Sequence, residues 1–180
     1  MMAPAYDIQT YLLDKSNIED TIQKQVLYYD LKDVSLLEQE VYAPECIIDY
    51  TAMFGGEPWH TTSKDWAKEV VELTGTLDSA QHYLSGILVR LPQPGSNGNG
   101  RPETCTAIAN GGAHMVRQEA EGGQLLHNGG RQDYEVVRLP ELEEQGENPW
   151  RIRTQKITPL WTKGNPRVLE LMNGGSIIPK

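Results

Sequence analysis

The chain has 180 residues, of which 25 are acidic and 16 are lysine or arginine, so its net charge at neutral pH is −9. The basic residues form no cluster, which argues against nucleic acid or an anionic membrane surface as a partner. No apolar run approaches the roughly 20 residues that span a bilayer, and the N-terminus lacks the pattern of a secretory signal. We therefore expect a cytoplasmic protein whose partner is a small, neutral molecule.

Three helices are predicted in the N-terminal half. The first begins where Ser16 and Glu19 have the spacing of a capping box. The second spans residues 34–43 and ends before Pro44, because the residue preceding a proline is pushed out of the α region. The third ends at Gly75. The supporting residues are Ile18, Ile22, Val26 and Tyr29 on the first helix, Val34, Leu37 and Val41 on the second, Trp66, Val70 and Leu73 on the third, and Thr61, Thr62 and Ser63 as its candidate N-caps.

Strand-like runs alternate with turns through the rest of the chain. The predicted strands are residues 45–54, 79–91, 103–120, 131–139 and 149–161. Helices followed by a run of antiparallel strands predict an α+β fold in which a curved sheet wraps the helices. Such a sheet leaves a pocket on its concave side, lined by alternate strand residues and the inward faces of the helices. Residues 92–103 read as a hairpin loop.

Two histidines lie in the middle of predicted strands, His82 and His114. If both face one cavity, they can move protons near neutral pH, and Asp30 can orient one ring and stabilise its imidazolium. The alternative is that each of these residues only satisfies a neighbour's hydrogen bond. No histidine has metal-ligand spacing, so no metal is expected. Cys46 and Cys105 are expected to be buried thiols.

Alternation along the strands indicates which polar side chains face inward. In the strand at residues 45–54, Tyr50 belongs to the more apolar face and Asp49 to the other. In a later strand the less charged face carries Gln132 and Tyr134. A register shifted by one residue would instead place Asp133 inside.

Several short motifs together resemble scytalone dehydratase and its SnoaL-like polyketide-cyclase relatives in the nuclear transport factor 2-like superfamily. They are Tyr29-Asp30 at the end of the first helix, "IDYT" in the first strand, "QH" after the third helix, "AHMV" in a later strand and "GRQDYEVVR". The resemblance covers about residues 16–162. It implies one domain over residues 1–180, a tail at 163–180, and a cone-shaped α+β barrel with three helices in the concave face of a mixed, mostly antiparallel sheet.

The resemblance also implies roles for individual residues. Tyr29 and Tyr50 would hold a water or a substrate carbonyl, and His82 and His114 would act as acid and base with Asp30 as the orienting carboxylate. Further contacts to the substrate are expected from Gln132, Tyr134, Met53 and Trp66. The sequence departs from the dehydratase pattern where that enzyme has a serine and an asparagine, since Gly130 and Gln132 stand there. A homodimer or trimer paired through the convex sheet face is also implied.

The sequence therefore predicts a cofactor-independent lyase or isomerase, of a dehydratase or cyclase type, acting on a neutral polyketide- or terpenoid-like molecule. The alternative is a non-catalytic ligand-binding or oligomerisation module of the same fold. A third possibility, an epoxide hydrolase or rearrangement catalyst, needs an acidic residue beside an arginine in the pocket. Asp133 and Arg131 would provide that pair only in the shifted register.

Overall fold

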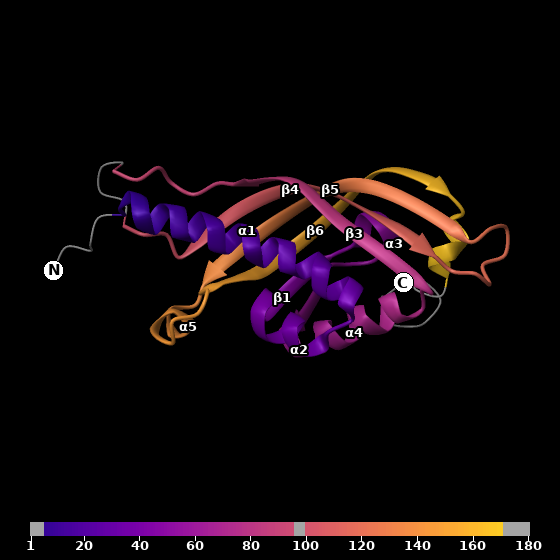
Figure 1. Cartoon of the computed structure of the whole chain (residues 1–180), viewed down its shortest axis with the longest axis horizontal. Coiled ribbons are helices and arrows are strands. Elements are labelled where there is room, and N and C mark those ends of the chain that lie inside the picture. The colour runs from indigo at the N-terminus through magenta and orange to yellow at the C-terminus, as the bar shows by residue number, and fades with distance from the viewer. Residues whose placement is uncertain (1–5, 96–99, 171–180) are drawn as a thin grey trace.

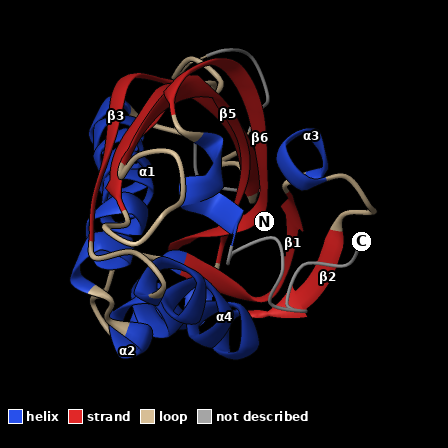
Figure 2. Cartoon of the chain, turned by 90° about the vertical axis from the view of Figure 1, so that its right-hand side faces the viewer, coloured by secondary structure: helices blue, strands red, loops and turns tan. Residues whose placement is uncertain are grey.

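The computed structural model describes residues 6–95 and 100–170. Six strands form one curved sheet in the order β2-β1-β6-β5-β4-β3, with helices against its concave side (Figures 1 and 2). Strands β1 and β6 are parallel, and every other neighbouring pair is antiparallel. The strands are β1 (Tyr42–Asp49), β2 (Trp59–Thr62), β3 (Ser79–Val89), β4 (Thr104–Val116), β5 (Leu125–Arg138) and β6 (Trp150–Gly164). The predicted α+β class and the mixed, mostly antiparallel sheet are confirmed, but the sheet stays open rather than closing into a barrel.

The first helix is longer than predicted. Helix α1 spans Ile8–Leu31, and its N-cap is Asp7, whose carboxylate accepts hydrogen bonds from two backbone N–H groups of the first turn. Ser16 lies in the middle of the helix, so the capping-box spacing there was misleading. The helix ends at Lys32, which adopts a left-handed conformation with φ 55°.

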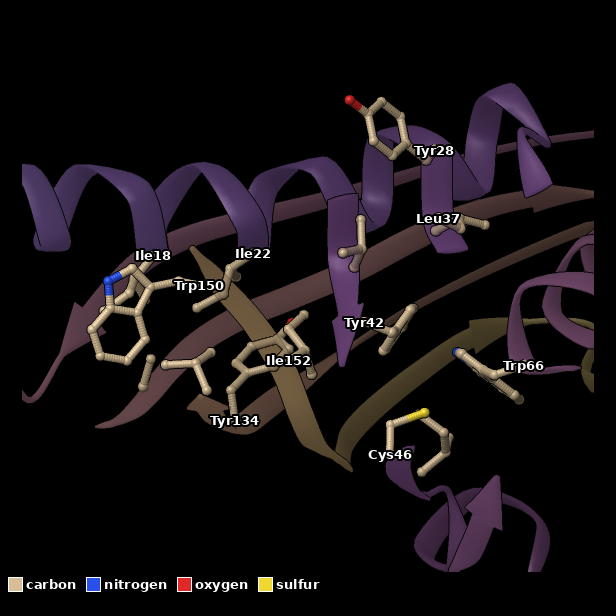
Figure 3. Close-up of a cluster of buried hydrophobic side chains, with 14 of the residues drawn as sticks. Ile18, Ile22, Tyr28, Leu37, Tyr42, Cys46, Trp66, Tyr134, Trp150 and Ile152 are labelled. Atoms are coloured by element: carbon tan, nitrogen blue, oxygen red, sulfur yellow. The ribbon is translucent and has the colours of Figure 1, made fainter. Parts of the chain in front are cut away.

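The core lies between α1 and the sheet. Figure 3 shows Ile18 and Ile22 on the helix beside Trp150 and Ile152 of β6, with Tyr134 of β5 nearby. The four apolar side chains are fully buried. Burying such a side chain contributes about 1.5–3 kcal/mol, so this contact fixes how α1 lies across the sheet.

The second predicted helix forms as a short α-helical turn, α2 (Val34–Leu36), followed by a π-helical turn at Leu37–Val41. The third forms as α4 (Ser63–Gly75), with Thr62 as its N-cap. Gly75 is the last residue of α4 rather than the residue beyond it. None of the helices in the described parts of the chain is long and apolar enough to cross a bilayer.

The predicted strand at residues 45–54 is wrong in its second half. Strand β1 ends at Asp49, and α3 (Thr51–Phe54) begins after a single residue, Tyr50. The edge strand β2 and helix α5 (Pro140–Glu144) were not predicted. In the tail, where the segment from Asn165 onward was expected to add a short helix, a 3₁₀ turn forms at Pro166–Leu169. Of the predicted tail, residues 171–180 lie outside the described residues.

Candidate active site

A cavity of about 100 Å³ lies between the helices and the concave face of the sheet. Its apolar wall comes from α1, α3, α4, β4, β6 and the 3₁₀ turn: Val26, Met53, Phe54, Val70, Leu73, Ala113, Met115, Ile157, Pro159 and Leu169. Its polar side chains are Gln25, Tyr29, Tyr50, Thr74, His82, Asn128, Gln132 and Gln155. Among the described residues, no lysine, arginine, aspartate or glutamate lines it, so the cavity suits an uncharged molecule.

Asp30 holds His82 at two points. One carboxylate oxygen lies 2.6 Å from the ring nitrogen Nδ1, and the other accepts a hydrogen bond of 2.8 Å from the His82 backbone N–H. The contact forms because the end of α1 lies against β3, which brings together two residues 52 positions apart. With Nδ1 protonated and directed at the carboxylate, Nε2 keeps its lone pair and can accept a proton.

The His82 ring belongs to two surfaces. It lines the cavity, and together with Asp30 it also lines a groove between α1 and β3 that opens to solvent. Each side chain keeps about one fifth of its surface exposed, 21% for His82 and 20% for Asp30. The histidine can therefore meet a bound molecule while its carboxylate partner stays partly hydrated.

Tyr29 is the centre of a buried network of hydroxyl and amide groups. Its hydroxyl oxygen accepts hydrogen bonds from the Gln25 amide at 3.2 Å and the Trp66 indole N–H at 3.3 Å. It also makes a short contact with the Tyr42 hydroxyl and lies 3.5 Å from that of Tyr50. The network thus ties α1 to α4 and β1 beneath the cavity.

The hydrogen bonds of this network determine which donor groups remain available to a ligand in the cavity. The Gln155 amide nitrogen donates to the Tyr50 oxygen and to the Gln132 carbonyl, both at 3.2 Å. Because the Tyr29 oxygen already accepts twice, the hydroxyl hydrogen of Tyr50 is free to point at a ligand. The Gln132 carbonyl also accepts from Tyr134 at 2.6 Å, whereas its amide nitrogen has no partner among the described residues. This part of the cavity therefore offers hydrogen-bond donors.

Burial raises the pKa of all four tyrosines of the network. For Tyr42, Tyr50 and Tyr134 the pKa lies well above the usual value of 10, and neighbouring tyrosine hydroxyls add to the effect of burial. Burial also raises the pKa of Tyr29, and its hydrogen-bond partners oppose that shift. At neutral pH these groups are uncharged donors.

These pKa shifts predict a loss of stability in alkali. A phenol whose pKa is higher in the folded than in the unfolded chain stabilises the fold fully below the unfolded pKa, near 10. That contribution is lost as pH rises above 10. Urea unfolding followed from pH 7 to pH 11 should therefore show a falling free energy of unfolding, with a smaller fall in Tyr134→Phe. Equal falls in both proteins would contradict the prediction.

The sequence matches a known domain family over residues 10–156, described as the SnoaL-like domain. The chain belongs to the SnoaL-like family. No curated protein sequence matches it.

Solved structures with similar folds agree with this membership. The Kfla4162 protein from Kribbella flavida has a TM-score of 0.74 and 20% identity, over 91% of this chain and 99% of that one. A provisional scytalone dehydratase from Novosphingobium aromaticivorans has a TM-score of 0.64 and 17% identity, over 88% and 92%. The hexachlorocyclohexane dehydrochlorinase LinA-type3 from Novosphingobium barchaimii has a TM-score of 0.61 and 12% identity, over 87% and 92%. At these identities the similarities show the nuclear transport factor 2-like fold.

The predicted site residues of this SnoaL-like chain separate into two groups. Tyr29, Tyr50, Met53, His82 and Gln132 line the cavity. Trp66 and Tyr134 do not line it: both are buried behind it, where they donate hydrogen bonds to the network. The sequence predicted that Trp66 and Tyr134 contact the substrate directly, whereas in the structure both support the side chains that line the cavity.

His114 faces away from the cavity, which contradicts the expectation that both strand histidines share it. Strands β3 and β4 pair Gln81 with His114 and His82 with Ala113, so His82 and His114 point to opposite sides of the sheet. The sequence of β4 indicates this orientation, because small and apolar residues occupy its odd-numbered positions. These buried residues are Cys105, Ala107, Ala109, Ala113 and Met115.

Four glycines form a part of the cavity wall that the sequence analysis missed. Gly111 lies opposite Gly130, and Gly112 lies opposite Gly129, in neighbouring pairs of β4 and β5. At Gly130 an added Cβ would come within 2.5 Å of the Thr158 carbonyl oxygen. Clusters of Gly-Gly in adjacent strands of a curved sheet are the sequence signal for such a bare wall.

Other candidate groups lie outside this site. Arg131 and Asp133 pair with each other at 2.8 Å away from the cavity, so the register with Gln132 inward holds. Cys46 and Cys105 are free and buried, and burial raises their thiol pKa to about 12 and about 11. The described residues contain no group of three or more His, Cys, Asp or Glu placed to hold a metal.

Proposed function

We propose that this SnoaL-like protein is a cofactor-independent lyase or isomerase that uses general acid–base catalysis on a neutral small molecule. The observation that carries the proposal is the two-point hold of Asp30 on His82 at the edge of an uncharged cavity. Two proteins of similar fold carry names of elimination enzymes, a provisional scytalone dehydratase and a dehydrochlorinase. Those names support the class of reaction rather than the substrate.

Each chemical step has a residue in place. His82 Nε2 removes a proton from a carbon next to a substrate carbonyl, and Asp30 stabilises the imidazolium that forms. The Tyr50 hydroxyl donates to the carbonyl oxygen as negative charge develops there. The imidazolium then returns the same proton, either to a leaving hydroxyl, which departs as water, or to another carbon, which completes an isomerisation. His82 carries both proton transfers, because His114 lies on the other side of the sheet.

The cavity narrows the class of substrate. A volume of about 100 Å³ is smaller than the roughly 150 Å³ of a cavity that binds benzene, so the enclosed part of the substrate is no larger than one ring. The absence of a charged side chain from the described lining favours a neutral molecule, and the free Tyr50 and Gln132 donors favour one with acceptor oxygens. A small cyclic hydroxyketone has these properties, and a polyketide- or terpenoid-like substrate would have to place a single ring in the cavity. A single domain over residues 1–180 and a dimer or trimer stay predictions.

Proton exchange tests the proposal without knowledge of the final product. Neutral cyclic ketones and hydroxyketones are incubated with the protein in D₂O, and loss of the protons beside the carbonyl is followed by NMR. The wild type should accelerate exchange for at least one compound. His82→Ala should lose about 10²–10⁴-fold of that acceleration, the usual contribution of a general base. His114→Ala is the matched control, a strand histidine outside the cavity, and should exchange like the wild type.

Two outcomes would contradict the proposal. Full exchange activity in His82→Ala would exclude this histidine as the base. Tight binding of a compound with no exchange by the wild type would favour the rival function, a non-catalytic binding module. Binding is measured separately by isothermal titration calorimetry, so the two results are distinguishable.

A further inference from the structure

Asn128 of β5 lines the cavity, but the proposed proton transfers do not use it. It stands in one row across the sheet with Ala113 of β4 and His82 of β3. Neighbouring strands are about 4.8 Å apart, so the backbones of His82 and Asn128 are separated by about 10 Å. All three residues line the cavity, and Ala113 carries only a methyl group. The histidine and the asparagine therefore stand on either side of a space that a ligand can fill.

One hydrogen bond sets the orientation of the Asn128 amide. Its oxygen Oδ1 accepts from the backbone N–H of Ala113 at 3.2 Å. Its nitrogen Nδ2 carries two donor hydrogens and has no hydrogen-bond partner among the described residues. The acceptor end of the amide is thus turned to the sheet, and the donor end is available to a molecule in the cavity.

Gln132 supplies a second amide donor from the same strand. Residues 128, 130 and 132 share the inner face of β5, and Gly130 leaves the wall bare between the two amides. The Gln132 nitrogen lies over this bare wall, since a Cβ added to Gly111 would come within 2.8 Å of it. Two free NH₂ groups therefore border the glycines, and each can hold one oxygen of a bound molecule.

The positions of the donors define the order of groups in a ligand. Tyr50 and Gln132 lie together at one end of the glycine wall, where the oxygens of both accept from the Gln155 amide. Asn128 lies at the other end, in the row of His82. A ketone whose oxygen is held by Tyr50 and Gln132 can place a second oxygen on Asn128, and the carbon between them then lies next to His82. A carbonyl, an acidic carbon and a hydroxyl-bearing carbon in this order make a β-hydroxyketone.

We infer, on the basis of the proposed acid–base function, that Asn128 binds the leaving hydroxyl of a cyclic β-hydroxyketone and that the reaction is an elimination of water. His82 removes the proton from the carbon between the two oxygens, and the electron pair of that bond passes to the carbonyl oxygen held by Tyr50. The enolate re-forms its carbonyl as the carbon–carbon double bond forms and the bond to the hydroxyl breaks. The imidazolium gives its proton to the departing oxygen, so the products are water and an α,β-unsaturated ketone.

Asn128 has two effects on this elimination. Its NH₂ group donates to the hydroxyl oxygen, on which negative charge develops as the carbon–oxygen bond breaks. Because Asn128 shares a row with His82, it also keeps that oxygen on the face of the ring from which the proton was removed. The imidazolium can reach the oxygen there. An isomerisation, the other outcome of the same proton abstraction, needs no such contact.

Calorimetry with two ligands tests the hydroxyl site separately from turnover. It is carried out in His82→Ala protein, which lacks the proposed base, with 3-hydroxycyclohexanone and with cyclohexanone, which lacks the hydroxyl. This protein should prefer the hydroxyketone by about 3- to 10-fold, the usual contribution of one hydrogen bond. Adding Asn128→Leu, of similar shape but without a donor, should abolish the preference. Adding Asn110→Leu is the matched control, because Asn110 is an exposed asparagine of β4, and should preserve it.

The ultraviolet absorbance of the conjugated ketone follows the reaction itself. The protein with His82 intact should convert 3-hydroxycyclohexanone to this product. Asn128→Leu should slow the elimination about 10- to 100-fold more than it slows proton exchange in cyclohexanone, because only the elimination places charge on the hydroxyl oxygen. Circular dichroism checks that the variant keeps its fold.

The outcomes separate this inference from the proposed function. Equal slowing of elimination and exchange in Asn128→Leu, or no preference for the hydroxyketone in His82→Ala protein, would overturn the role of Asn128 and leave His82 as the base. Exchange by the wild type without any conjugated ketone would overturn the elimination. Lack of exchange in every ketone would instead overturn the proposed function, and a preference lost with Asn128→Leu would then identify a binding site alone.

Discussion

Replacing Asp30 by asparagine should lower proton-exchange activity by about 10²–10⁴-fold while leaving the fold intact. The asparagine oxygen can still accept the hydrogen bond from the His82 backbone N–H, which the wild-type carboxylate accepts at 2.8 Å. The amide NH₂ then faces His82 Nδ1 and donates to it. The ring is forced into the tautomer with its proton on Nε2, so the nitrogen proposed as the base has no free lone pair.

Asp49→Asn is the matched control for this experiment. Asp49 is also a partly buried carboxylate beside the cavity-forming elements, but it pairs with Lys156 at 3.0 Å and with the hydroxyl of Thr51. This variant should keep wild-type exchange rates. Circular dichroism distinguishes a lost base from a damaged fold, since loss of the base alone leaves the spectrum unchanged. Equal rates in Asp30→Asn and the wild type would exclude the Asp30–His82 pair from catalysis.

Replacing Asp14 by alanine should cost about 3–5 kcal/mol of stability, the usual penalty for removing one partner of a buried ion pair. Asp14 is fully buried in α1, where its carboxylate accepts hydrogen bonds from Tyr6 at 3.0 Å, from Trp150 at 2.8 Å and from two nitrogens of Arg101 at 2.6 and 3.0 Å. The change leaves these donors without their acceptor. Chemical denaturation gives the free energy of unfolding directly.

An exposed ion pair provides the comparison. Glu121 pairs with Arg167, but 85% of the Glu121 side chain is exposed, so solvent screens the contact. Glu121→Ala should unfold at the same denaturant concentration as the wild type. Asp14→Asn keeps one acceptor oxygen, so its free energy of unfolding should lie between those of Asp14→Ala and Glu121→Ala. A loss in Asp14→Ala no larger than that in Glu121→Ala would show that the Asp14 cluster contributes little.

Local sequence signals were reliable where the conformation of a segment depends mainly on its own residues. Apolar spacing at Ile18, Ile22 and Val26 placed most of α1, and alternation placed Gln132 on the inner face of β5. The errors lie at ends of elements, where several signals compete. Asp7 caps α1 instead of Ser16, and the strand through Tyr50 ends early because the chain turns into α3.

The candidate site shows the same division. The residue types were recognisable in the sequence, and Tyr29, Tyr50, His82 and Gln132 do line the cavity. Their roles depend on contacts between distant segments. The Tyr50 hydroxyl hydrogen is free because the Tyr29 oxygen already accepts from Gln25 and Trp66, and the Tyr50 oxygen is held by Gln155 of β6. No local pattern predicts these bonds.

By itself, the sequence determined the α+β class, most of the helices, the inward face of β5 and the set of polar residues available for chemistry, because periodicity and propensity are local properties. Only the tertiary structure decided that Asp30 holds His82, that the sheet stays open, and that His114 lies outside with His127. Those outcomes depend on which strands pair and in which register, and a shift of one residue moves every side chain to the opposite face.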